Sequence, residues 1–217
     1  MEATKAALIV IDMQRGFLDE SSPLCIRGAR ATVPACARVL AHARKTGIPV
    51  FYVSRAYRPD GSDVENTRLA PWLSGGKPMT PGSTGPHSAE IPAEMAPQPG
   101  DYQLYKPRFS AFFQTELDLM LRRLRIDTVL LTGTTTPNCI RTSCYDAISL
   151  DYNVAILTDC CSSNTEEIQQ SNLRDMKNIG ACLLTSDAFI RQGLPDADPA
   201  GQAAEEVRTL RSGSRKD

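Results

Sequence analysis

Short apolar runs alternate with helical patterns of apolar residues along this chain, and this alternation restricts the fold more than any other feature. Residues 6–11 form a continuous apolar run, residues 32–46 carry apolar side chains three and four positions apart, and residues 48–53 form a second run. A continuous apolar run is typical of a strand buried on both faces, and helical spacing between two such runs indicates a β-α-β unit. We predict an α/β protein, a three-layer α/β/α structure with a mostly parallel sheet of about six strands.

The alternation is interrupted by a long irregular stretch and then resumes. Residues 54–100 are rich in Pro, Gly, Ser and Thr and show little periodicity. Further strands are predicted at residues 102–106, 128–132, 154–157 and 181–184. Because irregular segments of such length usually build a site or an interface, we predict one domain over residues 1–193 with residues 54–100 as an insertion near the site. Residues 194–217 are predicted to be a polar C-terminal tail.

Charge and cysteine content restrict the partners. The 217 residues include 24 basic and 25 acidic side chains, so no strong overall field attracts nucleic acid or an anionic membrane. No apolar stretch approaches the ~20 residues of a membrane span. We expect a small-molecule partner, no nucleic acid and no membrane. Seven cysteines without C-x-x-C spacing indicate reduced thiols and a cytoplasmic location.

Cys139 lies where a predicted strand gives way to a predicted helix. Residues 130–139 read Leu-Leu-Thr-Gly-Thr-Thr-Thr-Pro-Asn-Cys, which makes Thr136 the expected N-cap and places Cys139 in the first turn. The free N–H groups of a first turn carry partial positive charge, so we expect a lowered thiol pKa and a stabilised thiolate. Alternatively, Cys139 is a packing residue, because cysteine is among the most buried residue types.

Asp12 and Lys106 also stand at the ends of predicted strands. In open parallel sheets, ligands bind in the crevice beyond the carboxyl ends of the strands. A carboxylate, an ammonium group and the Cys139 thiol are therefore expected to converge on one side of the sheet. Each has a structural alternative: Asp12 as a loop-capping carboxylate, and Lys106 as a solvated strand end.

Three segments resemble the signature segments of the isochorismatase-like cysteine hydrolases. They are residues 9–17 (IVIDMQRGF), 106–112 (KPRFSAF) and 133–142 (GTTTPNCIRT), in the order that the family has. That superfamily includes nicotinamidases, N-carbamoylsarcosine amidases, ureidoacrylate amidases and biuret hydrolases. The resemblance covers residues 6–190 and implies the isochorismatase-like hydrolase fold, with an Asp-Lys-Cys triad at Asp12, Lys106 and Cys139.

Such a triad predicts amide hydrolysis without a cofactor. We expect Asp12 to take the thiol proton of Cys139, and the thiolate to attack an amide or ureido carbonyl and form a thioester that water hydrolyses. Lys106 would hold Asp12 in place. Backbone N–H groups around Thr134, Thr135 and Cys139 would receive the oxyanion. The resemblance also implies a cis peptide bond between Thr134 and Thr135.

Two departures from the sequences of related families narrow the range of possible substrates. Nicotinamidases resemble one another in an Asp-x-His segment with a further histidine, which together bind a divalent metal, whereas residues 54–58 here read Ser-Arg-Ala-Tyr-Arg. The chain has two histidines, His42 and His87, so no metal site is predicted. Isochorismatases proper cleave a vinyl ether and do not need the cysteine, so the presence of Cys139 favours C–N cleavage.

Further side chains are candidates for substrate binding: Phe17, Arg55, Trp72, Phe109 and Asn138. Arg55 either binds a substrate carboxylate or ureido oxygen through its planar fork, or forms a surface ion pair with Asp60 or Asp63. The three aromatic residues either form an apolar pocket wall or belong to the core or an interface. Asn138 either contacts substrate or satisfies the turn.

The sequence therefore predicts a metal-independent cysteine amidohydrolase that acts on a small carboxamide or carbamoyl compound. The resemblance also implies a homo-oligomer, a dimer or a tetramer, because members of that superfamily resemble one another in forming such assemblies. Two alternatives stay open. One is a nicotinamidase or isochorismatase-type hydrolase, and the other is a non-catalytic hydrolase-like protein that binds a ligand or senses redox state through its thiol.

Overall fold

A six-stranded sheet forms the centre of the protein. The computed structural model describes residues 5–80, 87–194 and 205–211. Its strands are β1 (Ala6–Ile11), β2 (Val50–Arg55), β3 (Tyr102–Lys106), β4 (Thr128–Thr134), β5 (Asn153–Ser162) and β6 (Cys182–Leu184). All neighbouring strands are parallel, in the order β3-β2-β1-β4-β5-β6. The predicted parallel sheet of about six strands is confirmed.

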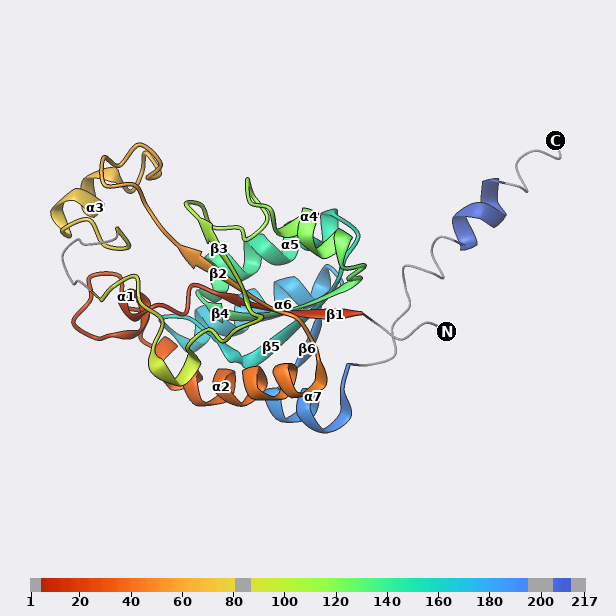
Figure 1. The fold of residues 1–217 in the computed structure, drawn as a ribbon. Helices are drawn as coiled ribbons and strands as arrows, with labels where there is room; N and C mark the ends of the chain where they lie inside the picture. The colour runs from red at the N-terminus through yellow and green to blue at the C-terminus, as the bar shows by residue number, and fades with distance from the viewer. Residues whose placement is uncertain (1–4, 81–86, 195–204, 212–217) are drawn as a thin grey trace.

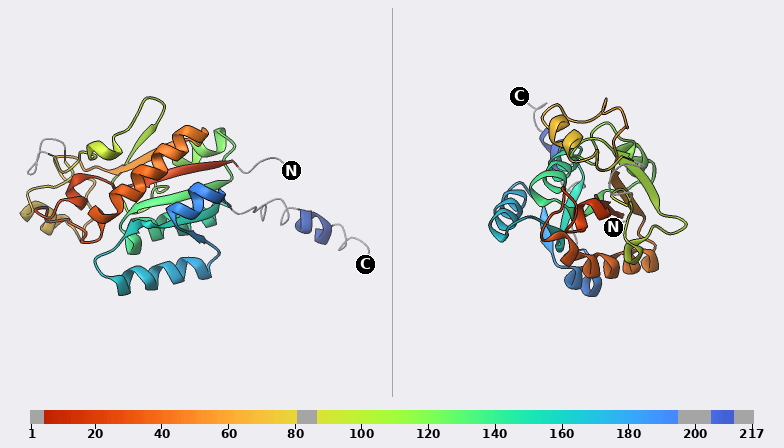
Figure 2. Two further views of the ribbon diagram at one scale, coloured as in Figure 1. Left: turned by 90° about the horizontal axis from the view of Figure 1, so that it is seen from below. Right: turned by 90° about the vertical axis from the view of Figure 1, so that its left-hand side faces the viewer.

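Helices cover both faces of this sheet (Figure 1). The helical segments of the described residues are α1 (Arg15–Leu18), α2 (Ala29–Thr46), α3 (Leu69–Ser74), η1 (Ala93–Met95), α4 (Leu117–Arg123), η2 (Thr136–Ile140), α5 (Arg141–Ser149), α6 (Glu166–Asn178) and α7 (Ser186–Gln192). Helices α2 and α7 pack on one face, seen from below in Figure 2, and α4, α5 and α6 pack on the other. The predicted three-layer α/β/α architecture is therefore confirmed.

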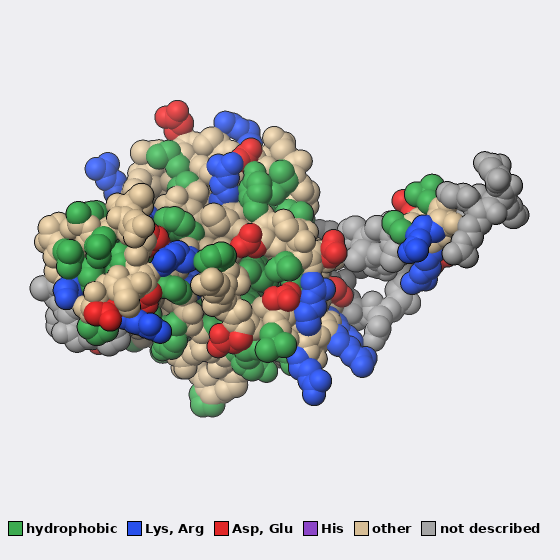
Figure 3. Space-filling view, turned by 90° about the horizontal axis from the view of Figure 1, so that it is seen from above, with side chains coloured by type: hydrophobic (Ala, Val, Ile, Leu, Met, Phe, Trp, Pro, Cys, Tyr) green, Lys and Arg blue, Asp and Glu red, His purple; other side chains and the backbone are tan. Residues whose placement is uncertain are grey.

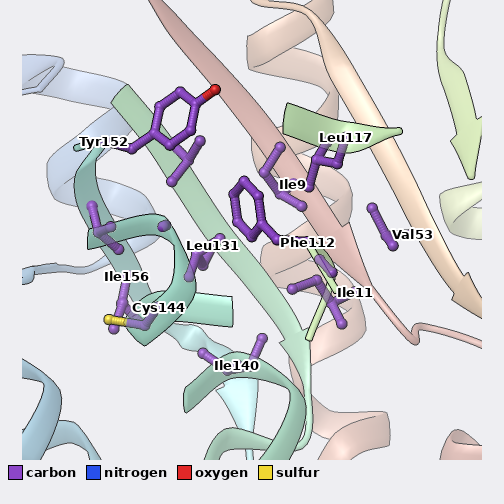
Figure 4. Close-up of a cluster of buried hydrophobic side chains, with 14 of the residues drawn as sticks. Ile9, Ile11, Val53, Phe112, Leu117, Leu131, Ile140, Cys144, Tyr152 and Ile156 are labelled. Carbon is purple, nitrogen blue, oxygen red and sulfur yellow. The ribbon is translucent and has the colours of Figure 1, made fainter. Parts of the chain in front are cut away.

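Strand β1 shows how the sheet divides the core. Successive side chains of a strand point to opposite faces. Ile9 and Ile11 pack under α4 and α5 with Leu131 and Ile140 (Figure 4), whereas the alternate residues of β1 pack against α2. Every residue of β1 is buried, which explains why its sequence shows a continuous apolar run and no polar alternation.

Gly133 lets the carboxyl end of β4 approach β1 closely. It has a φ of +119°, and a Cβ at this position would collide with the carbonyl oxygen of Ile11. We expect Gly133→Ala to lower the free energy of unfolding by about 3 kcal/mol or more, because the backbone must move to relieve the clash. Gly47→Ala is the matched control: its φ is +75° but its surroundings are open, so it should cost about 1 kcal/mol. Urea unfolding of both variants checks this, and equal losses would contradict the clash.

The first part of the irregular insertion, with α3, lies beyond the carboxyl end of β2 (Figure 1), whereas η1 packs on the α2 side of the sheet. Strand β2 continues through Arg55, so the insertion begins after that residue and not at residue 54. It contains the two short helices α3 and η1, and its residues 81–86 lie outside the described residues. Of the predicted polar tail, residues 195–204 and 212–217 also lie outside them, while residues 205–211 form a helix with exposed side chains.

The described surface agrees with the small net charge. Acidic and basic side chains are interspersed among apolar ones on the face shown in Figure 3. Among the described helices, none combines the length and the apolar character that crossing a bilayer requires.

Candidate active site

Asp12 occupies the turn that follows β1. Its φ is +51°, a left-handed conformation that aspartate tolerates better than most residues. Its N–H donates to the carbonyl of Val53 over 3.2 Å, so the turn is fixed against the neighbouring strand β2. The side chain is fully buried.

Lys106 reaches Asp12 from two strands away. It ends β3 in register with Arg55, and both continue the alternation of Val53 and Leu104, so both side chains lie on the α4 and α5 face of the sheet. Strand β2 separates β3 from β1, a gap of roughly 10 Å that the Lys106 and Asp12 side chains bridge together. Lys106 Nζ lies 2.7 Å from Asp12 Oδ2, and both side chains are fully buried. The alternative of a solvated strand end for Lys106 is therefore wrong.

The Asp12 carboxylate keeps one oxygen without a partner. Lys106 Nζ donates to Asp12 Oδ2 and, over 3.1 Å, to the carbonyl of Arg108. Asp12 Oδ1 is buried and has no hydrogen-bond partner in the part of the chain that the structure describes. Because leaving a buried acceptor unpaired costs free energy, this oxygen is a candidate for a functional proton acceptor.

Cys139 lies in the short π-helical turn η2 that precedes α5. The N-cap is Thr135 and not Thr136 as predicted, and the N–H of Ile140 donates to the carbonyl of Thr135 over 3.3 Å. The hydroxyl of Thr136 donates to the carbonyl of Ser162, which directs this side chain toward the neighbouring strand β5. Single π-helical turns are frequent at functional sites.

Burial raises the pKa of the Cys139 thiol, contrary to the predicted lowering. Only 4% of the residue is exposed, and its desolvation is the main cause. Lys106 and Arg55 lower the pKa through their positive charges, but the Asp12 carboxylate raises it, and the net shift is upward. The resting thiol is therefore protonated near neutral pH, and a base has to take its proton for it to act as a nucleophile.

Arg55 is a buried neighbour of the thiol. Its Nη2 lies 3.5 Å from Cys139 Sγ, while its Nη1 donates to the Tyr57 hydroxyl (3.0 Å), to Glu65 Oε1 (2.9 Å) and to the Pro107 carbonyl (3.0 Å). The alternative of a surface pair with Asp60 or Asp63 is wrong, because the ion pair forms with Glu65 and only 2% of the Arg55 side chain is exposed.

Glu65 neutralises Arg55 and should make stability depend on pH. Burial alone would raise the pKa of Glu65, but Arg55 and the hydroxyl of Tyr57, whose own pKa burial raises to about 12, hold it below its ordinary value. We expect Glu65→Gln to lower the free energy of unfolding by about 3 kcal/mol, because it leaves Arg55 buried and unpaired.

The loss of unfolding free energy in the Glu65→Gln protein should be complete above pH 4.5, the ordinary pKa of glutamate. It should become smaller as the pH falls through the lowered pKa of Glu65. At low pH the protonated Glu65 is as neutral as glutamine, so the two proteins become alike. Urea unfolding of both proteins between pH 7 and about pH 3 measures the difference, and a constant or growing difference at low pH would contradict this role of Glu65.

Sequence reasoning missed Gln14, Tyr57, Glu65 and Arg68. The buried Gln14 side-chain amide donates to the carbonyl of Arg55 over 2.9 Å and accepts its N–H over 2.7 Å, so it fixes the end of β2 beside the turn after β1. The only available signal for Gln14 was its place in the first signature segment. The others lie in the insertion, where no periodicity marks which side chains point inward.

A cavity of about 280 Å³ opens over Cys139. Among the residues predicted for the site, its walls include Phe17, Arg55, Phe109, Thr134, Thr135, Asn138 and Cys139. The peptide bond between Thr134 and Thr135 is cis, as the resemblance implies. Asp12 and Lys106 line no part of this cavity and are buried behind it.

Trp72 does not line the cavity over Cys139, although it was predicted beside the other candidates. It is buried, with its indole N–H donating to the carbonyl of Pro78 over 3.0 Å. It lines a second cavity of about 390 Å³, which shares Phe17 and Arg55 with the first. A larger cavity of about 600 Å³ at the start of α6 contains no predicted site residue.

The walls around Cys139 do not fit a divalent metal. Among the described residues that line its cavity there is no histidine and no carboxylate, and Arg55 and Arg68 would repel a cation. His42 packs edge to face on Phe189, and His87 lies beside Glu90 at the surface.

Comparisons with known proteins identify the family. A family model described as the isochorismatase domain matches residues 6–188. The chain belongs to the isochorismatase family. Its structure is similar to the crystal structure of an isochorismatase family protein from Desulfovibrio vulgaris, with a TM-score of 0.82 and 44% identity, covering 86% of this chain and 96% of that one.

Curated members of the isochorismatase family are also similar in sequence. A probable inactive nicotinamidase from Arabidopsis thaliana is 40% identical over 176 residues, covering 80% of this chain and 89% of the relative. A maleamate amidohydrolase from Pseudomonas putida is 32% identical over 192 residues, covering 87% and 86%. The predicted family is confirmed, and the chain is an isochorismatase-family hydrolase.

Proposed function

We propose that this hydrolase is a metal-independent cysteine amidohydrolase that cleaves the C–N bond of a small carboxamide or carbamoyl compound. The observation that carries the proposal is the buried Lys106–Asp12 ion pair beside a cysteine that lines a cavity. Asp12 Oδ1, the buried oxygen without a partner among the described residues, is the base. Cys139 is the nucleophile.

In the first step, Asp12 Oδ1 accepts the Sγ proton of Cys139 while Oδ2 keeps its contact with Lys106. The sulfur forms a bond to the carbonyl carbon, and the carbonyl oxygen becomes an oxyanion. Backbone N–H groups around Thr134, Thr135 and Cys139 receive that charge, and one such donor is typically worth ~3 kcal/mol at the transition state.

The charged side chains around Cys139 stabilise the thiolate after its proton has moved to Asp12. The Asp12 carboxylate raises the pKa of the thiol, and it loses that negative charge when it takes the proton. Lys106 and Arg55 keep their positive charges, which lower the pKa of the thiol. The thiolate therefore forms beside two cations, in a site where charges interact more strongly than in water.

In the second step, protonated Asp12 gives its proton to the leaving nitrogen as the C–N bond breaks. Ammonia or an amine leaves, and the acyl or carbamoyl group stays on Cys139 as a thioester. Asp12 then takes a proton from water as the water oxygen attacks the thioester carbon. The C–S bond breaks, and Asp12 returns the proton to the Cys139 sulfur. One water is consumed for each bond cleaved, and no oxidant, reductant or cofactor is needed.

A non-catalytic thiol protein is the second candidate. The Arabidopsis relative carries the word inactive in its name, and Cys25 lines the same cavity as Cys139. Two thiols on one cavity suit a redox sensor, in which the oxidised Cys139 sulfur is reduced by a neighbouring thiol.

Ammonia release from a panel of carboxamides and carbamoyl compounds, with and without a chelator, tests the proposal. We expect release from at least one compound that a chelator leaves unchanged and that the Cys139→Ala protein lacks. No release together with reversible modification of Cys139 by peroxide would favour the sensor. Release that a chelator abolishes, or release from nicotinamide alone, would favour the nicotinamidase alternative.

Assembly and location belong to the same proposal. We propose that the protein works in the cytoplasm as a homo-oligomer whose partner is a small molecule and neither nucleic acid nor membrane. All seven cysteines are free, which supports a reducing compartment. Light scattering of the purified protein should give the mass of a dimer or a tetramer, and a monomer mass would contradict the assembly.

A further inference from the structure

Arg68 places a positive charge on the wall of the Cys139 cavity. It directly precedes α3, is half-buried, and lines both the 280 Å³ cavity over Cys139 and the 390 Å³ cavity beside it. Among the described residues that line the two cavities, the only charged side chains are Arg55 and Arg68. The walls therefore carry two cations and no carboxylate.

The positive charge of Arg55 is already balanced. Its Nη1 lies 2.9 Å from Glu65 Oε1 and also donates to Tyr57 and Pro107, while its Nη2 faces Cys139 Sγ. The Asp12–Lys106 pair beneath the cavity is balanced in the same way. The Arg55–Glu65 and Lys106–Asp12 ion pairs are each neutral overall, so neither attracts a charged ligand.

Arg68 lacks such a partner. In the part of the chain that the structure describes, its guanidinium makes no ion pair and no side-chain hydrogen bond. It stacks over Phe109, with 4.6 Å between Cζ and the ring centroid, while Arg55 lies 5.3 Å from the same centroid. Stacking holds a guanidinium by its face and leaves the N–H groups at its edge available to an acceptor.

The excess positive charge lies in two partly enclosed cavities, and the 390 Å³ cavity is lined mostly by apolar side chains. A charge in such surroundings attracts an opposite charge more strongly than it does in bulk water. A carboxylate matches the planar fork of a guanidinium, which can bind both of its oxygens. The cavity therefore favours an anionic ligand over a neutral one of the same shape.

We propose that the substrate carries a carboxylate at the end remote from its scissile C–N bond, and that Arg68 binds this carboxylate. The inference rests on the proposed function for the reacting end of the substrate. It narrows the substrate class to small amido acids and N-carbamoyl amino acids. Arg68 determines specificity and takes no part in the bond-breaking steps.

Matched pairs of compounds test this charge preference in kinetics. Succinamate is compared with neutral succinamide, and N-carbamoylglycine with neutral isobutylurea, in which two methyl groups replace the two carboxylate oxygens. We expect kcat/KM to be at least about tenfold higher for the anionic member of a pair that is hydrolysed. Arg68→Met should raise KM for that anion by roughly 10- to 100-fold, with kcat within about threefold and the neutral compounds unaffected.

Two variants serve as controls. Arg58→Met removes the same charge from the insertion, but Arg58 is exposed and lines neither cavity, so the charge preference should stay as in the original protein. Arg68→Lys keeps a cation without the planar fork and should recover part of the preference. Equal effects of Arg68→Met and Arg58→Met would overturn the proposal.

Calorimetric binding in a Cys139→Ala background separates this inference from the proposed function, because it needs no turnover. We expect succinamate or N-carbamoylglycine to bind more tightly than its neutral partner, and Arg68→Met to remove the difference. If binding prefers the anion but the original protein hydrolyses no amide, the inference stands and the proposed function fails. If the members of every pair are hydrolysed alike, or no anionic compound binds, the inference is overturned.

Discussion

The Cys139→Ala protein is expected to lose amide turnover, with kcat lowered by at least about 10⁴-fold. The reason is that no other described sulfur lies next to both Arg55 and the Asp12–Lys106 pair. Ammonia release under saturating substrate measures the loss. Cys139→Ser should lose turnover as well, because a hydroxyl is far harder to deprotonate than a thiol.

Cys182→Ala is the matched control for this experiment. Cys182 begins β6 at the edge of the sheet and lines none of the cavities near Cys139, so its variant should keep full activity. Circular dichroism and thermal unfolding should show that the Cys139→Ala protein keeps its fold. Activity within tenfold of the original protein in a folded Cys139→Ala variant would contradict the role of Cys139 as the nucleophile.

The Asp12→Asn protein is expected to lose turnover while its thiol becomes more reactive. Without the carboxylate, no group takes the thiol proton or delivers it to the leaving nitrogen, so kcat should fall by about 10³-fold. The same change removes the negative charge that raises the pKa of Cys139 and leaves the lowering effects of Lys106 and Arg55. The rate of Cys139 alkylation by iodoacetamide at pH 7 should therefore rise.

This opposite movement distinguishes Asp12, whose negative charge opposes ionisation of the thiol, from a cation that stabilises the thiolate, whose loss should lower both rates. Lys106→Met is the companion variant: it removes a cation that lowers the pKa of the thiol, so alkylation should slow. Each variant breaks a buried ion pair, which costs about 3–5 kcal/mol, so both rates are measured well below the melting temperature of each protein. Slower alkylation of folded Asp12→Asn protein would contradict the proposed role of Asp12.

The convergence of Asp12, Lys106 and Cys139 could be predicted because it depends on topology. The apolar runs marked the buried strands, and parallel strands place their carboxyl ends at one edge of the sheet. The signature segments then assigned those strand ends to a known family. The strand order that puts β2 between Lys106 and Asp12 was not predicted from the sequence.

The electrostatics of the site could not be predicted from local sequence. The raised pKa of Cys139 results from its burial among segments that are distant in the chain, and a helix start alone indicated the opposite direction. The Thr136 hydroxyl was expected to cap its own helix, but its hydrogen bond goes to Ser162 on another strand. Glu65 and Arg68 lie in the insertion, where the sequence has no periodicity to show which side chains face the cavity.

Mass spectrometry of the protein after rapid acid quenching during turnover of an amide tests directly whether Cys139 forms a thioester. The peptide containing Cys139 is expected to gain the mass of the acyl or carbamoyl group within the first turnover. The gain should be absent from the Cys139→Ala protein. Turnover without any such gain, or a gain on another of the seven cysteines and none on Cys139, would contradict the thioester mechanism.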